Sequence, residues 1–260
     1  MSDSNGTVER FRDGSVAYLV LNHATKRNAM TLDMWSAIPA LVNELENDPS
    51  VKAVVIRGAG DSAFSSGADI SEFEQEYGNP ESAVRYNQAV RIAQLAIEQI
   101  HKPTVAMVHG ACVGGGCGLA LSCDFRFAAD DVRLGITPGK IGAAYSLPDT
   151  RRLVALVGSA CAKDILFSGR LLNAHEAKGM GLLDKVVAKS DLESALAGYL
   201  ELLAANSQQS IRVAKMMINS ISGVKPVPDR SLEEQFQAIF HGADFKEGVA
   251  AFLQKRAPRF

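Results

Sequence analysis

The sequence predicts an α/β fold in which strands and helices alternate over a mostly parallel sheet, followed by a largely helical C-terminal region. Three observations lead to this prediction. Nearly all-apolar runs, at residues 51–58 and 104–108, are typical of strands covered on both faces. Segments with apolar residues at helical spacing separate such runs, which indicates βα units. From residue 146 onward the pattern is mostly helical.

Size and composition are those of a globular protein with a large core: 260 residues, 47% hydrophobic and 22% charged. We expect a core domain over residues 1–200 and a helical region over residues 201–260. The net charge of −2 comes without a run of basic residues, which argues against nucleic acid and anionic membranes as main partners. No apolar run approaches the roughly 18 residues of a membrane span. Residues 1–12 are polar, unlike a signal peptide, so a cytoplasmic location is expected.

Cysteine and histidine spacing gives no sign of a metal site. The four cysteines include no C-x-x-C pair, and the five histidines are scattered along the chain. We therefore expect buried reduced thiols and no metal.

The first elements alternate as the fold class requires. Residues 16–21 form an alternating strand pattern, and Thr31 can cap a helix whose apolar residues recur at helical spacing as far as Leu45. Pro39 should kink this helix or shift its start. The apolar strand at 51–58 then leads into a small, turn-rich segment at 59–69.

An acidic stretch, residues 72–76, precedes a long amphipathic helix at about residues 81–100. A mobile loop or a solvated helix face would explain the acids better than a paired catalytic set. Two short strands, at 124–128 and 132–135, follow further along the chain, and the helical part breaks near Gly158, among other places.

A glycine-rich stretch at residues 108–120 separates an apolar strand, 104–108, from a small-residue helix at 116–122. A strand-to-helix turn of this kind presents backbone N–H groups at a helix N-terminus, where negative charge is favoured. The pattern is neither a Rossmann fingerprint nor a Walker A loop, because the required acidic residue and the Gly-Lys-Ser/Thr are missing. Tight packing of helix on sheet is the alternative interpretation.

Two separated segments together resemble a known family. Residues 63–70, Ala-Phe-Ser-Ser-Gly-Ala-Asp-Ile, and the glycine-rich stretch resemble the signature segments of the crotonase superfamily, the enoyl-CoA hydratase/isomerase family. The resemblance also runs through residues 26–30, 174–184 and 246–256, in the same order along the chain. The chain is identified on these grounds as a member of the family.

The resemblance implies a crotonase-like spiral of ββα units with a C-terminal helical trimerisation region, and hence trimers or dimers of trimers. It implies an acyl-CoA substrate whose thioester carbonyl binds the backbone N–H groups of Ala68 and Gly115. Two fixed donors of this kind stabilise an enolate, and losing one typically costs about 3 kcal/mol of barrier. Coenzyme A is part of the substrate, so no separate cofactor is expected.

Coenzyme A contacts are implied by the same resemblance. The nucleotide end is expected to be lined by Lys26, Arg27 and Ala29, and the pantetheine arm by Ala68, Asp69 and Ile70. Phe252 and Lys255 match positions that often reach the ligand from the C-terminal helix, sometimes of a neighbouring subunit. Cations near a 3′-phosphate and a pyrophosphate are electrostatically favourable.

The chain departs from the family at both positions where hydratases carry a glutamate. Here these positions hold Gly118 and Pro138, which cannot transfer a proton through a side chain. General acid or base help is usually worth about 10²–10⁴-fold per group, so two-glutamate hydration should be crippled.

Tyr145 is the side chain that remains for catalysis. The segment around it resembles the corresponding part of bacterial methylmalonyl-CoA decarboxylases, where a tyrosine stands at this place. That resemblance is incomplete, because those enzymes have a histidine at the position of Ala68 and a glutamate at that of Gly118. A phenol can orient a departing carboxylate or deliver a proton to an enolate. The alternative is a core tyrosine with a satisfied hydroxyl.

The sequence thus predicts a lyase or isomerase that stabilises a thioester enolate, with decarboxylase-like or isomerase-like chemistry at Tyr145. Two alternatives stay open. One is a hydratase or isomerase with a relocated carboxylate, for which Glu72, Glu74 and Glu76 are candidates. The other is a catalytically silent member that binds acyl-CoA.

Overall fold

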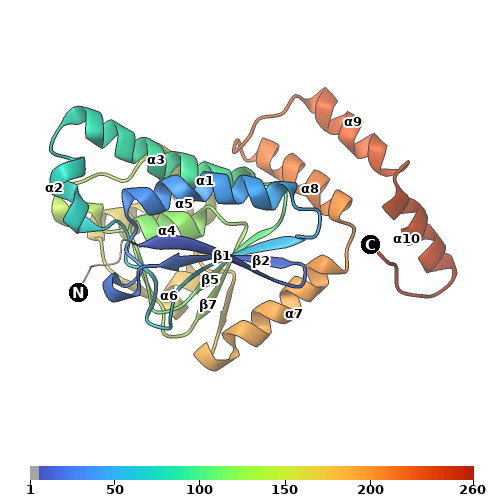
Figure 1. The fold of residues 1–260 in the computed structure, drawn as a ribbon, viewed down its shortest axis with the longest axis horizontal. Helices are drawn as coiled ribbons and strands as arrows, with labels where there is room; N and C mark the ends of the chain where they lie inside the picture. Colours follow the sequence, from blue (N-terminus) through green and yellow to red (C-terminus); the bar gives the residue numbers. More distant parts are fainter. Residues whose placement is uncertain (1–5) are drawn as a thin grey trace.

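The computed structural model describes residues 6–260, whose strands form two sheets (Figure 1). The larger has the order β1 (Thr7–Asp13), β2 (Val16–Asn22), β3 (Ala53–Gly58), β5 (Thr104–Val108), β7 (Phe125–Ala129) and β10 (Lys185–Val187). The smaller has the order β4 (Ala63–Ser65), β6 (Ala111–Val113), β8 (Arg133–Gly135) and β9 (Leu172–Asn173). Among the strand pairs within residues 6–260, β1–β2 and β8–β9 run antiparallel and the others run parallel, which confirms the mostly parallel arrangement.

A repeated ββα unit generates both sheets. Strands β3, β5 and β7 of the large sheet are each followed by a short strand of the small sheet, β4, β6 and β8, and then by helical chain. This is the crotonase-like spiral that the sequence resemblance implied. The short strands β4 and β6, and β1 at the edge, were not recognised from the sequence, because a three-residue strand leaves almost no periodic pattern.

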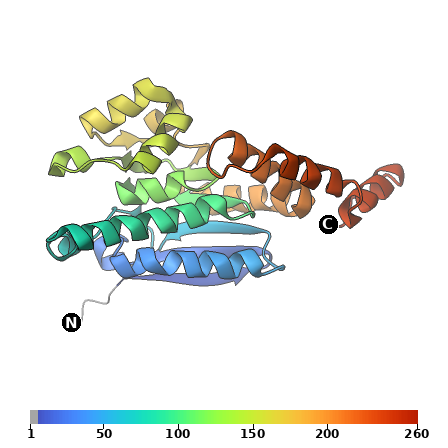
Figure 2. The same cartoon turned by 90° about the horizontal axis from the view of Figure 1, so that it is seen from above.

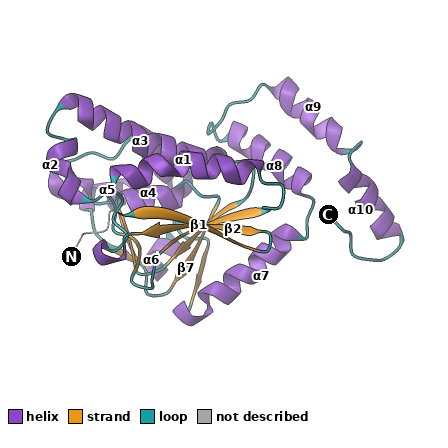
Figure 3. Ribbon diagram, in the orientation of Figure 1, coloured by secondary structure: helices purple, strands orange, loops and turns teal. Residues whose placement is uncertain are grey.

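Helices cover both faces of the large sheet (Figure 3). On one side are α1 (Leu32–Asn47), α3 (Pro80–Gln99), α4 (Gly115–Leu121) and α5 (Leu147–Ser168). Helices α1 and α3 lie side by side (Figure 2), and the core beneath them includes Trp35, Phe64 and Leu119. On the other side α7 (Leu192–Ala204) packs Leu192, Leu196 and Leu200 against the sheet. Short helices complete the fold: η1 (Ala24–Lys26), η2 (Ile70–Glu72), α2 (Phe73–Glu76), η3 (Pro138–Ile141), α6 (Ala174–Gly179) and η4 (Lys189–Asp191).

Local signals in the sequence set several helix boundaries correctly. The Thr31 hydroxyl accepts a hydrogen bond from the Met34 amide at 3.2 Å and caps α1. Pro39 lies inside α1 without shifting its start, so that part of the expectation was wrong. Gly158 adopts φ 74° and interrupts the helical geometry within α5, as the predicted break there requires.

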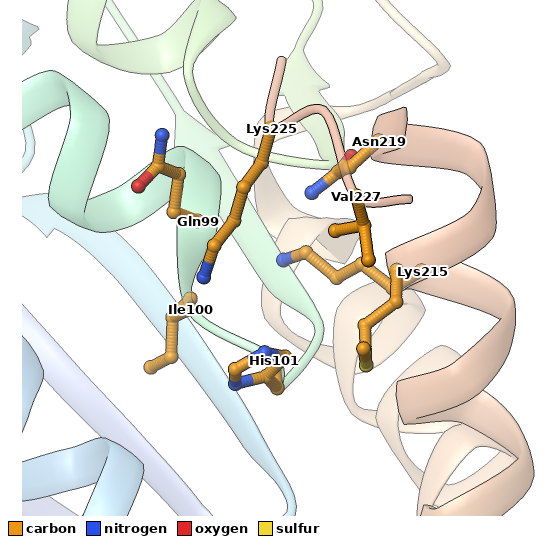
Figure 4. Close-up of a pocket in the computed structure, with 8 residues that line it drawn as sticks. Gln99, Ile100, His101, Lys215, Asn219, Lys225 and Val227 are labelled. Atoms are coloured by element: carbon orange, nitrogen blue, oxygen red, sulfur yellow. The ribbon is translucent and has the colours of Figure 1, made fainter. Parts of the chain in front are cut away.

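The C-terminal helices are α8 (Gln208–Ile221), α9 (Asp229–Ile239) and α10 (Ala243–Leu253). Helix α8 docks on the core through Lys215, whose ammonium lies 2.7 Å from the Asp124 carboxylate and donates to the Lys102 carbonyl. A cavity of about 30 Å³, room for about one water, lies at this junction between the end of α3 and α8 (Figure 4). Helices α9 and α10 extend away from the core (Figures 1 and 2).

Among the helices of residues 6–260, none combines the length and the apolar composition that crossing a lipid bilayer would need.

Candidate active site

Three loops that are distant in sequence meet at one edge of the small sheet. The Met30 amide donates to the Gly67 carbonyl at 2.7 Å, and the Asp69 amide donates to the Met30 carbonyl at 2.9 Å. The loop after η1 is thereby joined to the loop after β4 by a parallel bridge between Met30 and Ala68. Strand β6 lies beside β4 and brings the glycine-rich stretch to the same edge.

Asn28 holds the first of these loops in shape. Arg27 and Asn28 both have positive φ, 52° and 56°, a conformation that costs free energy for residues other than glycine. The buried Asn28 side chain offsets this cost: it donates to the Ala59 and Ala63 carbonyls and accepts from the His23 amide. The sequence analysis assigned no role to Asn28.

The backbone amides of Ala68 and Gly115 lie next to each other. A Cβ placed on Gly115 would lie 3.8 Å from the Ala68 nitrogen, and one on Gly67 would lie 3.4 Å from the Gly115 nitrogen. Within residues 6–260 neither amide donates to a protein acceptor, and both residues are partly exposed. Gly115 is the first residue of α4, so its N–H also has the positive end of the helix dipole. This arrangement suits a developing oxyanion.

Trp35 explains why residue 115 is a glycine. A Cβ there would lie 3.2 Å from the indole Cζ2 of Trp35, which is fully buried. A side chain at 115 would therefore push against a fixed wall of the core.

The expected coenzyme A residues Lys26 and Asp69 contact each other. The Lys26 ammonium lies 2.9 Å from the Asp69 carboxylate and donates to the Ser71 hydroxyl at 2.9 Å. Although burial opposes it, the Lys26 contact and the Ser71 hydrogen bonds hold the pKa of Asp69 below its usual value. Arg27 and Ile70 are exposed, whereas Ala29 is buried and offers mainly its backbone.

The Lys26→Ala, Arg27→Ala double variant should bind coenzyme A thioesters more weakly than the native protein, because both cations are proposed to face phosphates. Titration calorimetry at two salt concentrations measures this, and the loss should shrink at high salt. Arg230→Ala, at an exposed pair with Glu234 on α9, is the control. An unchanged dissociation constant would place the nucleotide site elsewhere.

Phe252 and Lys255 are not brought to these loops within one chain. Phe252 lies on α10 and Lys255 two residues after its end, at the opposite end of the molecule from α2 (Figure 1). Both are exposed, so a contact with the ligand would have to come from another copy of the chain.

Gly118 lies one turn after Gly115 on α4, and three polar groups surround it. A Cβ on Gly118 would lie 2.6 Å from Nε2 of Gln94, 3.1 Å from Oδ1 of Asp149 and 3.1 Å from the hydroxyl of Tyr145. These groups occupy the space into which a glutamate at 118 would extend. A side chain at 118 would displace the Gln94 amide and crowd Asp149 and Tyr145, which favours glycine at this position.

The Tyr145 hydroxyl is the most unusual of the three groups. Part of the residue is exposed, but the hydroxyl oxygen is enclosed and has no hydrogen-bond partner in the part of the chain that the structure describes. Burial raises its pKa well above the ordinary value, and the neighbouring Cys117 and Asp149 act in the same direction. The phenol therefore stays protonated at neutral pH and is available as a donor.

Asp149 is a functional candidate that the sequence analysis missed. Its carboxylate accepts from the Ser146 hydroxyl at 2.6 Å and from the Arg152 guanidinium at 3.1 Å. Burial raises the pKa of Asp149, against the lowering effect of Ser146 and Arg152. The sequence did contain one signal that could have pointed to Asp149. It follows Ser146 by three residues, which is the spacing found at the start of a capped helix.

The acidic segment does not supply a carboxylate to this cluster. Glu72 accepts from the Leu32 amide at 2.8 Å and so caps α1, and Glu74 is exposed. Glu76 is buried near Arg85, with 3.4 Å between the charged groups, so the solvated face expected from the sequence was wrong at this residue. Pro138 begins η3 and contributes no polar side chain.

Known proteins resemble this chain over nearly its whole length. The sequence profile described as enoyl-CoA hydratase/isomerase matches residues 12–260. The short-chain-enoyl-CoA hydratase of Clostridium acetobutylicum is 32% identical over 248 residues, 94% of each chain. The peroxisomal Δ(3,5)-Δ(2,4)-dienoyl-CoA isomerase of Arabidopsis thaliana is 30% identical and covers 99% of this chain and 98% of its own. A solved structure from Hyphomonas neptunium, assigned to the enoyl-CoA hydratase/isomerase family, superposes with a TM-score of 0.94 at 42% identity and covers 100% and 99% of the two chains.

Proposed function

Since this chain belongs to the enoyl-CoA hydratase/isomerase family, we propose that it is an acyl-CoA isomerase or lyase that works through a thioester enolate with Tyr145 as proton donor. The observation that carries this proposal is the enclosed Tyr145 hydroxyl beside the Asp149 carboxylate, one helical turn from the Gly115 amide.

The amides of Ala68 and Gly115 would accept the thioester oxygen. As a proton leaves C2 of the acyl group, negative charge moves onto that oxygen, and the two N–H donors stabilise it without having to reorient. Backbone donors suffice, which fits the absence of polar side chains at positions 68 and 115.

Asp149 and Tyr145 divide the proton transfer between them. The carboxylate of Asp149 would take the proton from C2, and the neutral phenol of Tyr145 would return one to the enolate at another carbon. The proton held by Asp149 would then pass to the phenolate, which restores both groups for the next turnover. For a 3-enoyl thioester, removal at C2 and return at C4 moves the double bond to C2–C3, so no atom is gained or lost. A general base with a raised pKa is suited to work near neutral pH.

The charges at the cluster favour isomerase-like over decarboxylase-like chemistry. When ionised, Asp149 and Glu98 place two negative charges beside the single positive charge of Arg152. A malonyl-type carboxylate would be repelled by this surplus, whereas an uncharged acyl chain would not. Decarboxylation, in which Tyr145 protonates the enolate after CO₂ leaves, is the weaker form of the proposal.

Hydration with a relocated carboxylate is the second candidate, and Asp149 is the residue that favours it. Its Oδ1 lies 3.1 Å from the position that a Cβ on residue 118 would take, so this carboxylate stands beside the place where the family resemblance leads us to expect a glutamate. A single carboxylate could activate water, but no second one replaces the glutamate missing at Pro138, so the reaction would be slow.

Hydrogen exchange at C2 tests the enolate directly. We expect the protein to incorporate deuterium at C2 of butyryl-CoA in heavy water and to convert 3-enoyl-CoA to 2-enoyl-CoA. Hydration of crotonyl-CoA should be far slower than in two-glutamate relatives, and methylmalonyl-CoA should release little CO₂. Hydration at their rate would contradict the proposal, and binding without exchange or turnover would favour a silent acyl-CoA-binding member.

Self-association to a trimer or a dimer of trimers is part of the proposal. Helices α9 and α10 carry the exposed aromatic side chains Phe236, Phe240, Phe245 and Phe252. A groove of about 360 Å³ next to α10 is lined mainly by apolar residues, and packing against other copies would cover this surface.

A further inference from the structure

Arg152 joins α3 to the proton-transfer cluster. Its Nε and Nη2 donate to the two carboxylate oxygens of Glu98 at 3.0 and 2.7 Å, a bidentate contact across 54 residues of sequence. Its Nη1 donates to Asp149 and to the Oε1 of Gln94, both at 3.1 Å. One guanidinium on α5 is thus shared by three acceptors from two helices.

This sharing limits what Arg152 can do for Asp149. The side chains of Arg152, Glu98 and Asp149 are 8%, 14% and 7% exposed, so solvent screens their charges only weakly. A lone Arg152–Asp149 pair would strongly favour the ionised carboxylate and make it a poor base. Glu98 forms the bidentate contact with the guanidinium and offsets its positive charge.

Gln94 supports the same interpretation. It is 1% exposed and its Oε1 accepts from Arg152, while its side-chain amide also acts on Asp149 and lowers the pKa of that carboxyl. A glutamate at position 94 would accept from Arg152 equally well but would add a third negative charge. The neutral Gln94 amide keeps the number of carboxylates around Arg152 at two.

We propose that Glu98 and Gln94 are positioning residues for proton transfer: they hold Arg152 so that Asp149 stays beside Tyr145 with a basicity suited to accepting a proton from the substrate. The inference rests on the proposed function, because it concerns the base of that reaction. Glu98 and Gln94 act through Arg152 and need not touch the substrate.

The titratable groups that face Asp149 are few. Arg152 lies on α5, the same helix as Asp149, and Glu98 on α3 acts through Arg152. Tyr145 lies just before α5, and Cys117 on α4 acts on Tyr145. Both carboxylates raise the pKa of Arg152 despite its burial, so the arginine stays charged throughout the working pH range.

Two isosteric variants should move the pH profile in opposite directions. Glu98→Gln removes a negative charge next to Arg152, so the pKa of Asp149 should fall and the acid limb of kcat should shift to lower pH by about 1 unit. Gln94→Glu adds a negative charge at the same guanidinium, so the acid limb should shift to higher pH by about the same amount. Glu98→Asp keeps the charge and should restore the native profile in part.

Glu46→Gln is the matched control, since Glu46 is a partly buried carboxylate that binds His101 at 2.8 Å on the outer part of α1. It should leave the acid limb in place. Carbon-13 NMR titration of the Asp149 carboxyl gives the same pKa values without turnover.

The possible outcomes separate the two proposals. Opposite shifts in the two variants support the positioning role, because loss of stability alone cannot change sign. Shifts in the same direction, or none, would overturn it even where the native enzyme exchanges C2 protons normally. Should the native enzyme exchange no C2 protons, the proposed function fails, while the NMR titration still decides whether Glu98 and Gln94 set the pKa of Asp149.

Discussion

Replacing Tyr145 with phenylalanine should lower C2 exchange and turnover by about 10²-fold or more, with acyl-CoA binding almost unchanged. The phenol of Tyr145 is the group proposed to return the proton. The other two side chains beside Gly118, Gln94 and Asp149, carry no hydroxyl. Because the hydroxyl has no partner within residues 6–260, its removal should leave the melting temperature unchanged or slightly higher.

Tyr199→Phe is the control, since Tyr199 packs against Phe125 and Phe127 on the far face of the large sheet. It should leave exchange intact. A Tyr145→Phe protein that kept its activity but lost stability would show that Tyr145 is only a packing residue.

Asp149→Asn should reduce C2 exchange by about 10²–10⁴-fold, because the amide keeps the shape of the carboxyl but cannot accept the proton. Arg152 would keep its bidentate contact with Glu98, so the protein should still fold. The loss of one buried ionic contact should lower the free energy of unfolding by about 1–3 kcal/mol. Steady-state kinetics and chemical denaturation on one preparation measure both effects.

Asp164→Asn controls for changes to α5, because Asp164 lies on this helix and forms an exposed pair with Arg170, which follows the end of the helix. Full exchange activity in Asp149→Asn would remove this carboxylate from the mechanism and contradict its proposed role as the base.

Much of the architecture could be predicted from local pattern. The apolar strands β3 and β5, the capped start of α1 and the break at Gly158 depend on residues that are close in sequence. The short strands β4 and β6 could not be found this way, because their pairing with each other, not their own three residues, makes them strands.

The proposed pair of oxyanion donors, the Ala68 and Gly115 amides, could be predicted in part from the sequence, because the geometry of a short backbone segment depends on neighbouring residues. A strand, a glycine-rich turn and a helix place the Gly115 amide at a helix N-terminus wherever they occur together. That the Ala68 amide lies beside it came from the family resemblance, and the adjacency of β4 and β6 provides the structural reason.

By itself, then, the sequence determined the fold class and the two signature segments, and it has Gly118 and Pro138 where the resemblance leads us to expect glutamates, since each of these depends on residues that are close in sequence. Only the tertiary structure decided what occupies the space over Gly118. Gln94 and Glu98 come from α3, and Asp149 and Arg152 come from α5, more than 50 residues away. Their charges matter only because burial against α4 removes the water that would otherwise screen them. No sequence pattern records that distance or that burial, so the base proposed here could be found only in the folded chain.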